Sequence, residues 1–240
     1  MFRSALHPVA HSIDSRPPLS GLLAVAAVLG AALAFGAFHA FGTATLPLVT
    51  FCVVVMISAY GLSHSYPHDV LGWCNVVTLA RAAMVAFLAG AVLSPGGTAW
   101  LVFAVASVAF ALDGVDGWLA RRSGLTSRFG ARFDMETDAG LGAVIALWLL
   151  VSGTTGPEIL VLGFMRYGFV VASLIWPVLQ APLPEAFRRK AICVVQVAAL
   201  VMLVCPLTPT ALVLPVGVLA ALLLSWSFMV DILSLIRRPA

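Results

Sequence analysis

Two segments of the 240-residue chain, 113–121 (DGVDGWLAR) and 130–138 (GARFDMETD), hold five of its ten acidic residues. Gly124 follows the first segment and predicts the end of one helix, while Thr126 or Ser127 is a good N-cap for the next. The stretch therefore predicts two antiparallel helices joined by a tight turn, with the acidic segments side by side.

The aspartates of these segments are spaced so that their carboxylates can meet. Asp113 and Asp116 are three residues apart, so both project from one face of the first helix. Asp134 and Asp138 are four residues apart and do the same on the second helix. If the turn centres near Leu125, Asp116 and Asp134 are each nine residues from it. Asp113 and Asp138 are twelve and thirteen residues away, so each couple ends at a similar depth and all four carboxylates can converge.

Converging carboxylates near hydrocarbon cannot all stay ionised without cations. A hard divalent ion, Mg²⁺ or Mn²⁺ rather than Zn²⁺, is the natural partner because no Cys or neutral His accompanies them. Two such ions about 3.5 to 4 Å apart would suit the holding of a diphosphate during attack by an oxygen nucleophile. Gly117, Ala120 and Gly130 would leave the helix faces bare for a bulky nucleotide. Arg121 would supply a cation at the level of the phosphates.

A simpler interpretation pairs the aspartates with nearby arginines that anchor the two helices at the membrane surface. The arginines available for this are Arg121, Arg122, Arg128 and Arg132. Such pairs account for one or two of the aspartates. They do not account for couples at matched depth with glycines beside them.

The composition places this turn in an integral membrane protein. Apolar residues make up 62% of the chain and charged residues 10%, against about 45 to 50% and about 25% in an average soluble domain. At about 20 residues for each crossing, the apolar material suffices for roughly seven or eight spanning helices and leaves no separate soluble domain. Interruptions by Gly, Pro and charged residues divide it into eight expected helices, at 21–42, 45–63, 73–93, 98–120, 130–152, 157–179, 190–206 and 210–235.

The basic residues are distributed as expected for eight crossings with both termini in the cytoplasm, which in a bacterium means the inner membrane. The odd-numbered connections carry no Lys or Arg, whereas the chain ends and the even-numbered connections carry Arg3, Arg16, Arg121, Arg122, Arg128, Arg132, Arg188, Arg189, Lys190, Arg237 and Arg238. These cations are spread over several loops, so no nucleic-acid partner is expected. Arg81 and Arg166 lie inside apolar runs, and Arg166 should face the bundle interior and a partner anion.

Written as spacing, the acidic window is D-x2-D-G-x2-A-R-x8-G-x3-D-x3-D, which fixes eight residues over 26 positions. This pattern resembles the signature of the CDP-alcohol phosphatidyltransferases at every position. A further element of that family, N-x2-T-x2-R, is matched by Asn75, Thr78 and Arg81.

The resemblance implies an all-α membrane fold with a six-helix catalytic core over residues 71–236. Here a cytoplasmic segment, 1–20, and two additional transmembrane helices within 21–63 precede that core. A homodimer is expected because members of the family tend to form one.

The activity implied by the resemblance is transfer of a phosphatidyl group from CDP-diacylglycerol to the hydroxyl of a small alcohol, with release of CMP. Two divalent metals, Mg²⁺ or Mn²⁺, would be bound by Asp113, Asp116, Asp134 and Asp138. Asp138 would also be the base that accepts the proton of the acceptor hydroxyl. The nucleotide and diphosphate would lie near Asn75, Thr78, Arg81, Gly117, Ala120, Arg121 and Gly130. For Asn75 and Thr78, a hydrogen bond between helices is the structural alternative.

Several cations are candidates for binding the acceptor alcohol, namely Arg132, Arg166, Arg188, Arg189 and Lys190. Arg166 resembles an Arg of the phosphatidylglycerophosphate synthases, although Tyr167 follows it where Glu is usual. The last three candidates open the seventh helix and favour a phosphorylated acceptor such as glycerol 3-phosphate, yet cytoplasmic loops are basic in any case. Asp231 is expected to form an ion pair at the end of the last helix, near Arg237 and Arg238.

Other functions fit the sequence less well. A Mg²⁺-dependent membrane prenyltransferase usually separates its two acidic motifs, whereas this chain gathers its acids into one window. A transporter or lipid scramblase would favour ionisable residues at the bilayer midplane and repeated halves. A family member that binds CDP-lipid without turnover remains an alternative.

Overall fold

The computed structural model describes residues 17–181 and 187–236, and this part of the chain folds into eight α-helices without a β-strand. The helices are α1 (Leu19–Phe41), α2 (Thr45–Ser65), α3 (Gly72–Leu93), α4 (Ala99–Ser123), α5 (Arg128–Val151), α6 (Ile159–Ile175), α7 (Phe187–Val204) and α8 (Thr210–Ile236), with a 3₁₀ turn η1 (Pro177–Gln180) after α6. The all-α architecture expected from the apolar runs is confirmed.

One helix boundary differs clearly from the sequence expectation. The apolar run at 157–179 predicts one long helix, but α6 ends at Ile175. Pro177 has no backbone N–H to continue the helix and disfavours helical backbone in the residue before it. The chain therefore turns into η1 at Pro177.

Five helices, α1, α2, α3, α4 and α8, are long and apolar enough to cross a bilayer. The other three depart from a plain span for visible reasons: α5 carries its acidic segment, α6 has 17 residues, and α7 opens with Arg188, Arg189 and Lys190. Large apolar side chains such as Phe35, Ile57 and Leu222 lie more than half exposed on the outside of the bundle. Hydrocarbon solvates such a surface, so the protein is an integral membrane protein.

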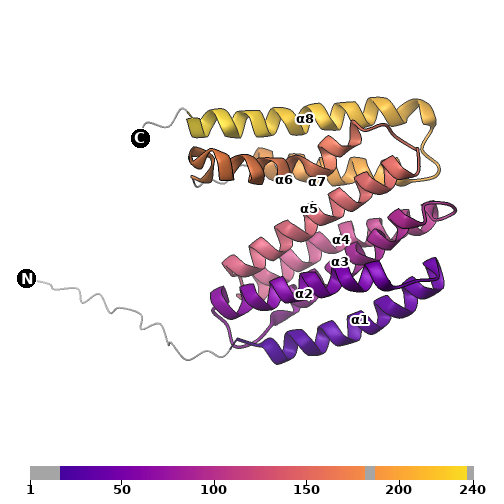
Figure 1. The fold of residues 1–240 in the computed structure, drawn as a ribbon. Coiled ribbons are helices and arrows are strands. Elements are labelled where there is room, and N and C mark those ends of the chain that lie inside the picture. The colour runs from indigo at the N-terminus through magenta and orange to yellow at the C-terminus, as the bar shows by residue number, and fades with distance from the viewer. Residues whose placement is uncertain (1–16, 182–186, 237–240) are drawn as a thin grey trace, which may run out of the picture.

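Helix α3 lies in the middle of the bundle, with α1 and α2 on one side and α6, α7 and α8 on the other (Figure 1). Two hydrophobic cores meet at this helix. One core packs Leu79, Ala82 and Ala86 of α3 against α1, α2 and the first turns of α5. The other joins α3 to α4, α5, α6, α7 and α8. A side chain in the middle of α3 is therefore enclosed by protein.

The connection between α4 and α5 has the tight geometry expected from its residues. Gly124 ends α4 with a φ of +69°, a left-handed conformation that suits glycine. Ser127 is the N-cap of α5, and its hydroxyl accepts a hydrogen bond from the backbone N–H of Gly130 at 2.9 Å. The acidic segments on the two sides of this turn consequently run antiparallel and adjacent.

This turn lies at the same end of the bundle as the beginning of α1 and the end of α8 (Figure 1). An even number of antiparallel helices produces this arrangement. The charges expected to hold the chain ends in the cytoplasm, Arg3, Arg16, Arg237 and Arg238, lie outside the described residues.

Candidate metal centre

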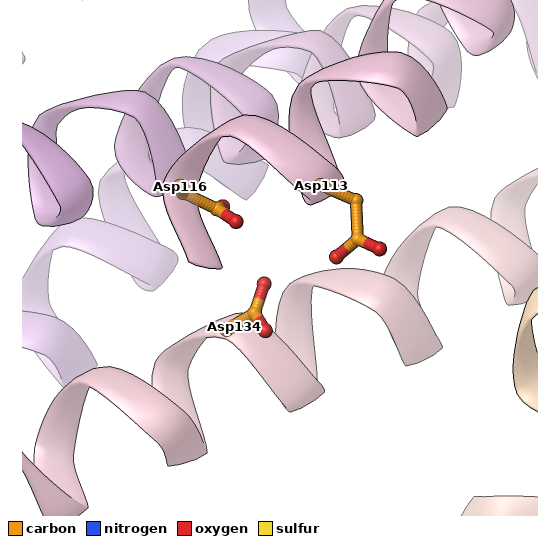
Figure 2. A group of neighbouring side chains, drawn as sticks. All are labelled: Asp113, Asp116 and Asp134. Atoms are coloured by element: carbon orange, nitrogen blue, oxygen red, sulfur yellow. The ribbon is translucent and has the colours of Figure 1, made fainter. Parts of the chain in front are cut away.

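Three carboxylates from α4 and α5 converge on one point. Asp113 and Asp116 project from α4 toward Asp134 of α5 (Figure 2). One oxygen of each lies within 4.8 Å of one oxygen of the other two. This separation is short enough for one cation to contact all three, and carboxylate oxygens are the ligands that Mg²⁺ and Mn²⁺ prefer.

The guanidinium of Arg81, on α3, lies among these carboxylates and also contacts a fourth. Its Nη1 lies 2.7 Å from Asp116 and 2.5 Å from Asp134. Its Nη2 lies 3.1 Å from Asp113 and contacts Asp138. Each terminal nitrogen therefore joins one aspartate of α4 to one of α5, in the two couples that lie at matched distances from the turn.

The four aspartates differ in burial. Asp116 is 3% exposed, whereas Asp113, Asp134 and Asp138 are 28%, 36% and 35% exposed. Asp116 also accepts a hydrogen bond from the Thr78 hydroxyl at 3.1 Å. Asp116 is thus the enclosed member of the cluster, and the other three carboxylates open toward the outside.

The charge of the cluster is not balanced by Arg81. One guanidinium faces four carboxylates, so three formal negative charges remain when all four are ionised. Charges held in a low-dielectric surrounding need partners of opposite sign. An oxygen-only ligand group with excess negative charge fits hard divalent cations.

The simpler interpretation, in which surface arginines neutralise the aspartates, is wrong. Within the described part of the chain, none of the four aspartates forms an ion pair with Arg121, Arg122, Arg128 or Arg132. Arg122 instead lies over the ring of Trp118, 4.9 Å from its centroid. The arginine that does bind the aspartates comes from a separate helix, which spacing within the acidic window does not reveal.

Asn75, from the first turn of α3, has both N–H groups of its amide engaged. The amide nitrogen donates to the backbone carbonyl of Leu71 at 2.5 Å and to the hydroxyl oxygen of Tyr66 at 3.0 Å. Its carbonyl oxygen faces Gly130, where an added Cβ would lie 3.3 Å from it. Asn75 is 2% exposed, so it joins the start of α3 to the start of α5 from inside the protein.

Tyr66 is not among the site residues expected from the sequence, since a single tyrosine after an apolar run has no distinguishing pattern. Its hydroxyl lies 2.9 Å from the carbonyl oxygen of Val70 and 3.0 Å from that of Leu71, either of which it can donate to. Its ring packs edge-on against Phe129 of α5. Burial raises the pKa of the Tyr66 phenol above its usual value, which keeps the hydroxyl protonated as a donor.

Replacing Tyr66 by Phe should lower the free energy of unfolding by about 1 to 2 kcal/mol, because an N–H of Asn75 loses its acceptor in a buried position. Thermal unfolding of the detergent-solubilised protein measures this change. Tyr60 on α2 is 68% exposed and provides the matched control, so Tyr60→Phe should unfold like the wild type. Equal unfolding temperatures for the two variants would contradict the structural role of the Tyr66 hydroxyl.

The remaining residues of the motif lie around the turn. The guanidinium of Arg121 folds back over Gly117, where an added Cβ would lie 3.3 Å from Nη1. Ala120 is partly buried and Arg121 is exposed, both in the last turns of α4. Gly130 is packed against Ser127 and Asn75, and Gly117 is covered by the Arg121 side chain, so neither motif glycine leaves the bare helix face that the sequence predicted.

The cations proposed for the acceptor occupy different surroundings. Arg166 of α6 lies 2.5 Å from Glu136 of α5, so it has the expected partner anion, but the two side chains are 30% and 47% exposed and the pair does not lie in the bundle interior. Arg189 of α7 lies 3.7 Å from Asp231 of α8. Arg132 and Lys190 are exposed.

Arg188 is held by α8. It donates to the hydroxyl of Ser227 at 2.5 Å and to the carboxylate of Asp231 at 2.5 Å. Asp231 was expected to form an ion pair at the end of the last helix, and it instead pairs with Arg188 of α7. Arg237 and Arg238 lie outside the described residues.

Comparison with known proteins gives one match. A sequence profile described as CDP-alcohol phosphatidyltransferase matches residues 71–232. The matched range begins one residue before α3 and ends within α8, so it contains all four aspartates and Arg81 and leaves α1 and α2 outside. No curated protein and no solved structure gives a significant match.

Proposed function

Since this chain belongs to the CDP-alcohol phosphatidyltransferase family, we propose that it transfers the phosphatidyl group of CDP-diacylglycerol to a small alcohol, releasing CMP and forming a phospholipid. Family membership itself implies a membrane transferase that uses a CDP-alcohol and depends on a divalent metal. The observation that carries the specific proposal is the convergence of Asp113, Asp116 and Asp134 on one point, with negative charge in excess. Asp138 is joined to this group through Arg81.

In this proposal, the four aspartates would hold two divalent ions, Mg²⁺ or Mn²⁺, and these would supply the positive charge that a diphosphate and a departing CMP require. Asp138 accepts the proton of the acceptor hydroxyl on its carboxylate. The acceptor oxygen forms a bond to the lipid-side phosphorus, and the bond between that phosphorus and the bridging oxygen breaks, so CMP departs with that oxygen. About a third of the Asp138 side chain is exposed, which allows a hydroxyl to reach it.

In this proposal, the nucleotide lies on the α4 side of the turn. Arg121, Gly117 and Ala120 lie together there, and the exposed Arg121 is suited to a phosphate oxygen. Asn75 and Thr78 are 2% and 4% exposed, so we assign them the holding of α3 against α4 and α5 rather than direct contact with the nucleotide.

The acceptor is proposed to be a phosphorylated alcohol such as glycerol 3-phosphate. Arg166 pairs with Glu136, two residues before Asp138 on α5, and Arg189 lies at the start of α7, and in this proposal both favour an anionic substrate. Arg188 contributes less directly, because its guanidinium is bound to α8. A homodimer with both termini in the cytoplasm completes the proposal and follows from the family resemblance and the distribution of basic residues.

The acceptor is identified by incubating membranes that contain the protein with CDP-diacylglycerol and a series of radiolabelled alcohols, with and without a phosphate. We expect a labelled phospholipid and an equal amount of CMP with a phosphorylated alcohol, and neither product with control membranes lacking the protein. Product from an unphosphorylated alcohol alone would reassign the acceptor. CDP-lipid binding, measured separately, without any product would favour the non-catalytic alternative. Consumption of a prenyl diphosphate supplied in place of CDP-diacylglycerol would favour a prenyltransferase.

A further inference from the structure

All nitrogen atoms of the Arg81 guanidinium are engaged inside the protein. Nε donates to the backbone carbonyl of Ala109 on α4 at 3.1 Å. Nη1 and Nη2 contact one oxygen on each of the four aspartates. A guanidinium offers five N–H groups, so these five contacts use its whole capacity. The side chain is 1% exposed, so protein encloses it.

The carboxylate oxygens that Arg81 contacts belong to the same four side chains that the proposed function assigns to the divalent ions. An oxygen that accepts from a guanidinium N–H offers less of its electron density to a metal. The positive charge of Arg81 also repels a divalent ion placed among these carboxylates. The position of Arg81 thus bears on metal binding, and not only on the packing of α3.

From this geometry we infer that Arg81 is a built-in counter-cation, which partly neutralises the carboxylates when no divalent ion is bound and competes with divalent ions for them. The inference rests on the proposed function, because it takes the four aspartates to be metal ligands. Arg81 is then a positioning residue for the metal centre, rather than the diphosphate contact that the sequence motif implies.

If Arg81 competes with divalent ions, removal of its charge should lower the stability of the metal-free protein and raise its affinity for a divalent ion. Without metal, four partly buried carboxylates lose their common partner, so the protein should become less stable. With metal, the cluster is more negative by one charge and its oxygens are free, so a divalent ion should bind more tightly. A residue that merely supports the fold would lower stability without tightening metal binding.

The test measures Mn²⁺ binding to the purified full chain in detergent, by electron paramagnetic resonance of the free ion, for the wild type and Arg81→Gln. We expect the Kd of the variant to be lower by at least about tenfold. In EDTA, its unfolding temperature should be lower by about 5 °C or more, and saturating Mn²⁺ should recover most of this loss. Arg122→Gln removes an exposed arginine from the last turn of α4 and is the control, with an Mn²⁺ affinity within about twofold of the wild type.

The outcomes separate this inference from the function on which it rests. Wild-type protein that binds no Mn²⁺ would contradict the metal centre itself. Wild-type binding with equal or weaker binding by Arg81→Gln would contradict the counter-cation alone. If Arg81→Gln does not fold, Arg81→Lys replaces it: a compact ammonium cannot reach all four carboxylates, so Mn²⁺ should bind at least about threefold more tightly than in the wild type. Unchanged or weaker binding by Arg81→Lys would also refute the competition.

Discussion

Replacing Asp138 by Asn should reduce CMP release from CDP-diacylglycerol, with any acceptor, by at least about a thousandfold. Asn keeps the size of the side chain but cannot accept the proton of the acceptor hydroxyl. It also removes one negative charge from the group proposed to hold the metals. The measurement compares initial rates of CMP formation for equal amounts of wild-type and variant protein in the same membranes.

The control for this experiment is Asp69→Asn. Asp69 is an exposed carboxylate between α2 and α3, outside the cluster, and its replacement should leave the rate within about twofold of the wild type. The fold should survive the change at position 138, because Arg81 retains three other aspartate partners. A folded Asp138→Asn protein that releases CMP at the wild-type rate would remove Asp138 as the base.

Chelation of divalent metal should abolish activity completely and reversibly. The cluster carries three formal negative charges beyond what Arg81 balances, and a diphosphate brings more negative charge to the same place. Without divalent ions, the substrate and the carboxylates repel each other. Activity is measured in excess EDTA and again after excess Mg²⁺ or Mn²⁺ is restored.

Two accompanying measurements make the chelation result specific. EDTA that has been saturated with Mg²⁺ before addition should have no effect on the rate. Circular dichroism in excess EDTA should show a protein that is still helical, because Arg81 partly neutralises the cluster in the absence of metal. Activity that persists at the wild-type rate in EDTA would exclude the metal mechanism.

The positions of the helices and of the aspartates were predictable because both depend on signals local in sequence. Apolar runs of bilayer length fix the helices, and Gly124 with Ser127 fixes the turn between α4 and α5. Once that turn is placed, helical periodicity alone brings Asp116 next to Asp134.

What was not predictable depends on contacts between segments distant in sequence. Arg81 reaches the aspartates only because α3 packs beside both α4 and α5 with one particular rotation about its axis. The bond from Asn75 to Tyr66 joins the additional helices to the core, and the pair between Arg188 and Asp231 joins α7 to α8. The spacing of residues within a single helix contains no information about which neighbour each of these side chains will meet.

Because α3 lies between two hydrophobic cores, the contribution of α1 and α2 to its stability depends on the solvent around the protein. In water, removal of α1 and α2 would expose Leu79, Ala82 and Ala86 of α3 to solvent at a large hydrophobic cost. In a bilayer, lipid acyl chains would solvate the same side of α3 almost as well as protein does. We therefore expect the pair of helices α1 and α2 to support the enzyme less by covering α3 than by a polar contact. The hydroxyl of Tyr66, directly after α2, binds Asn75 and the carbonyl of Leu71 at the start of α3.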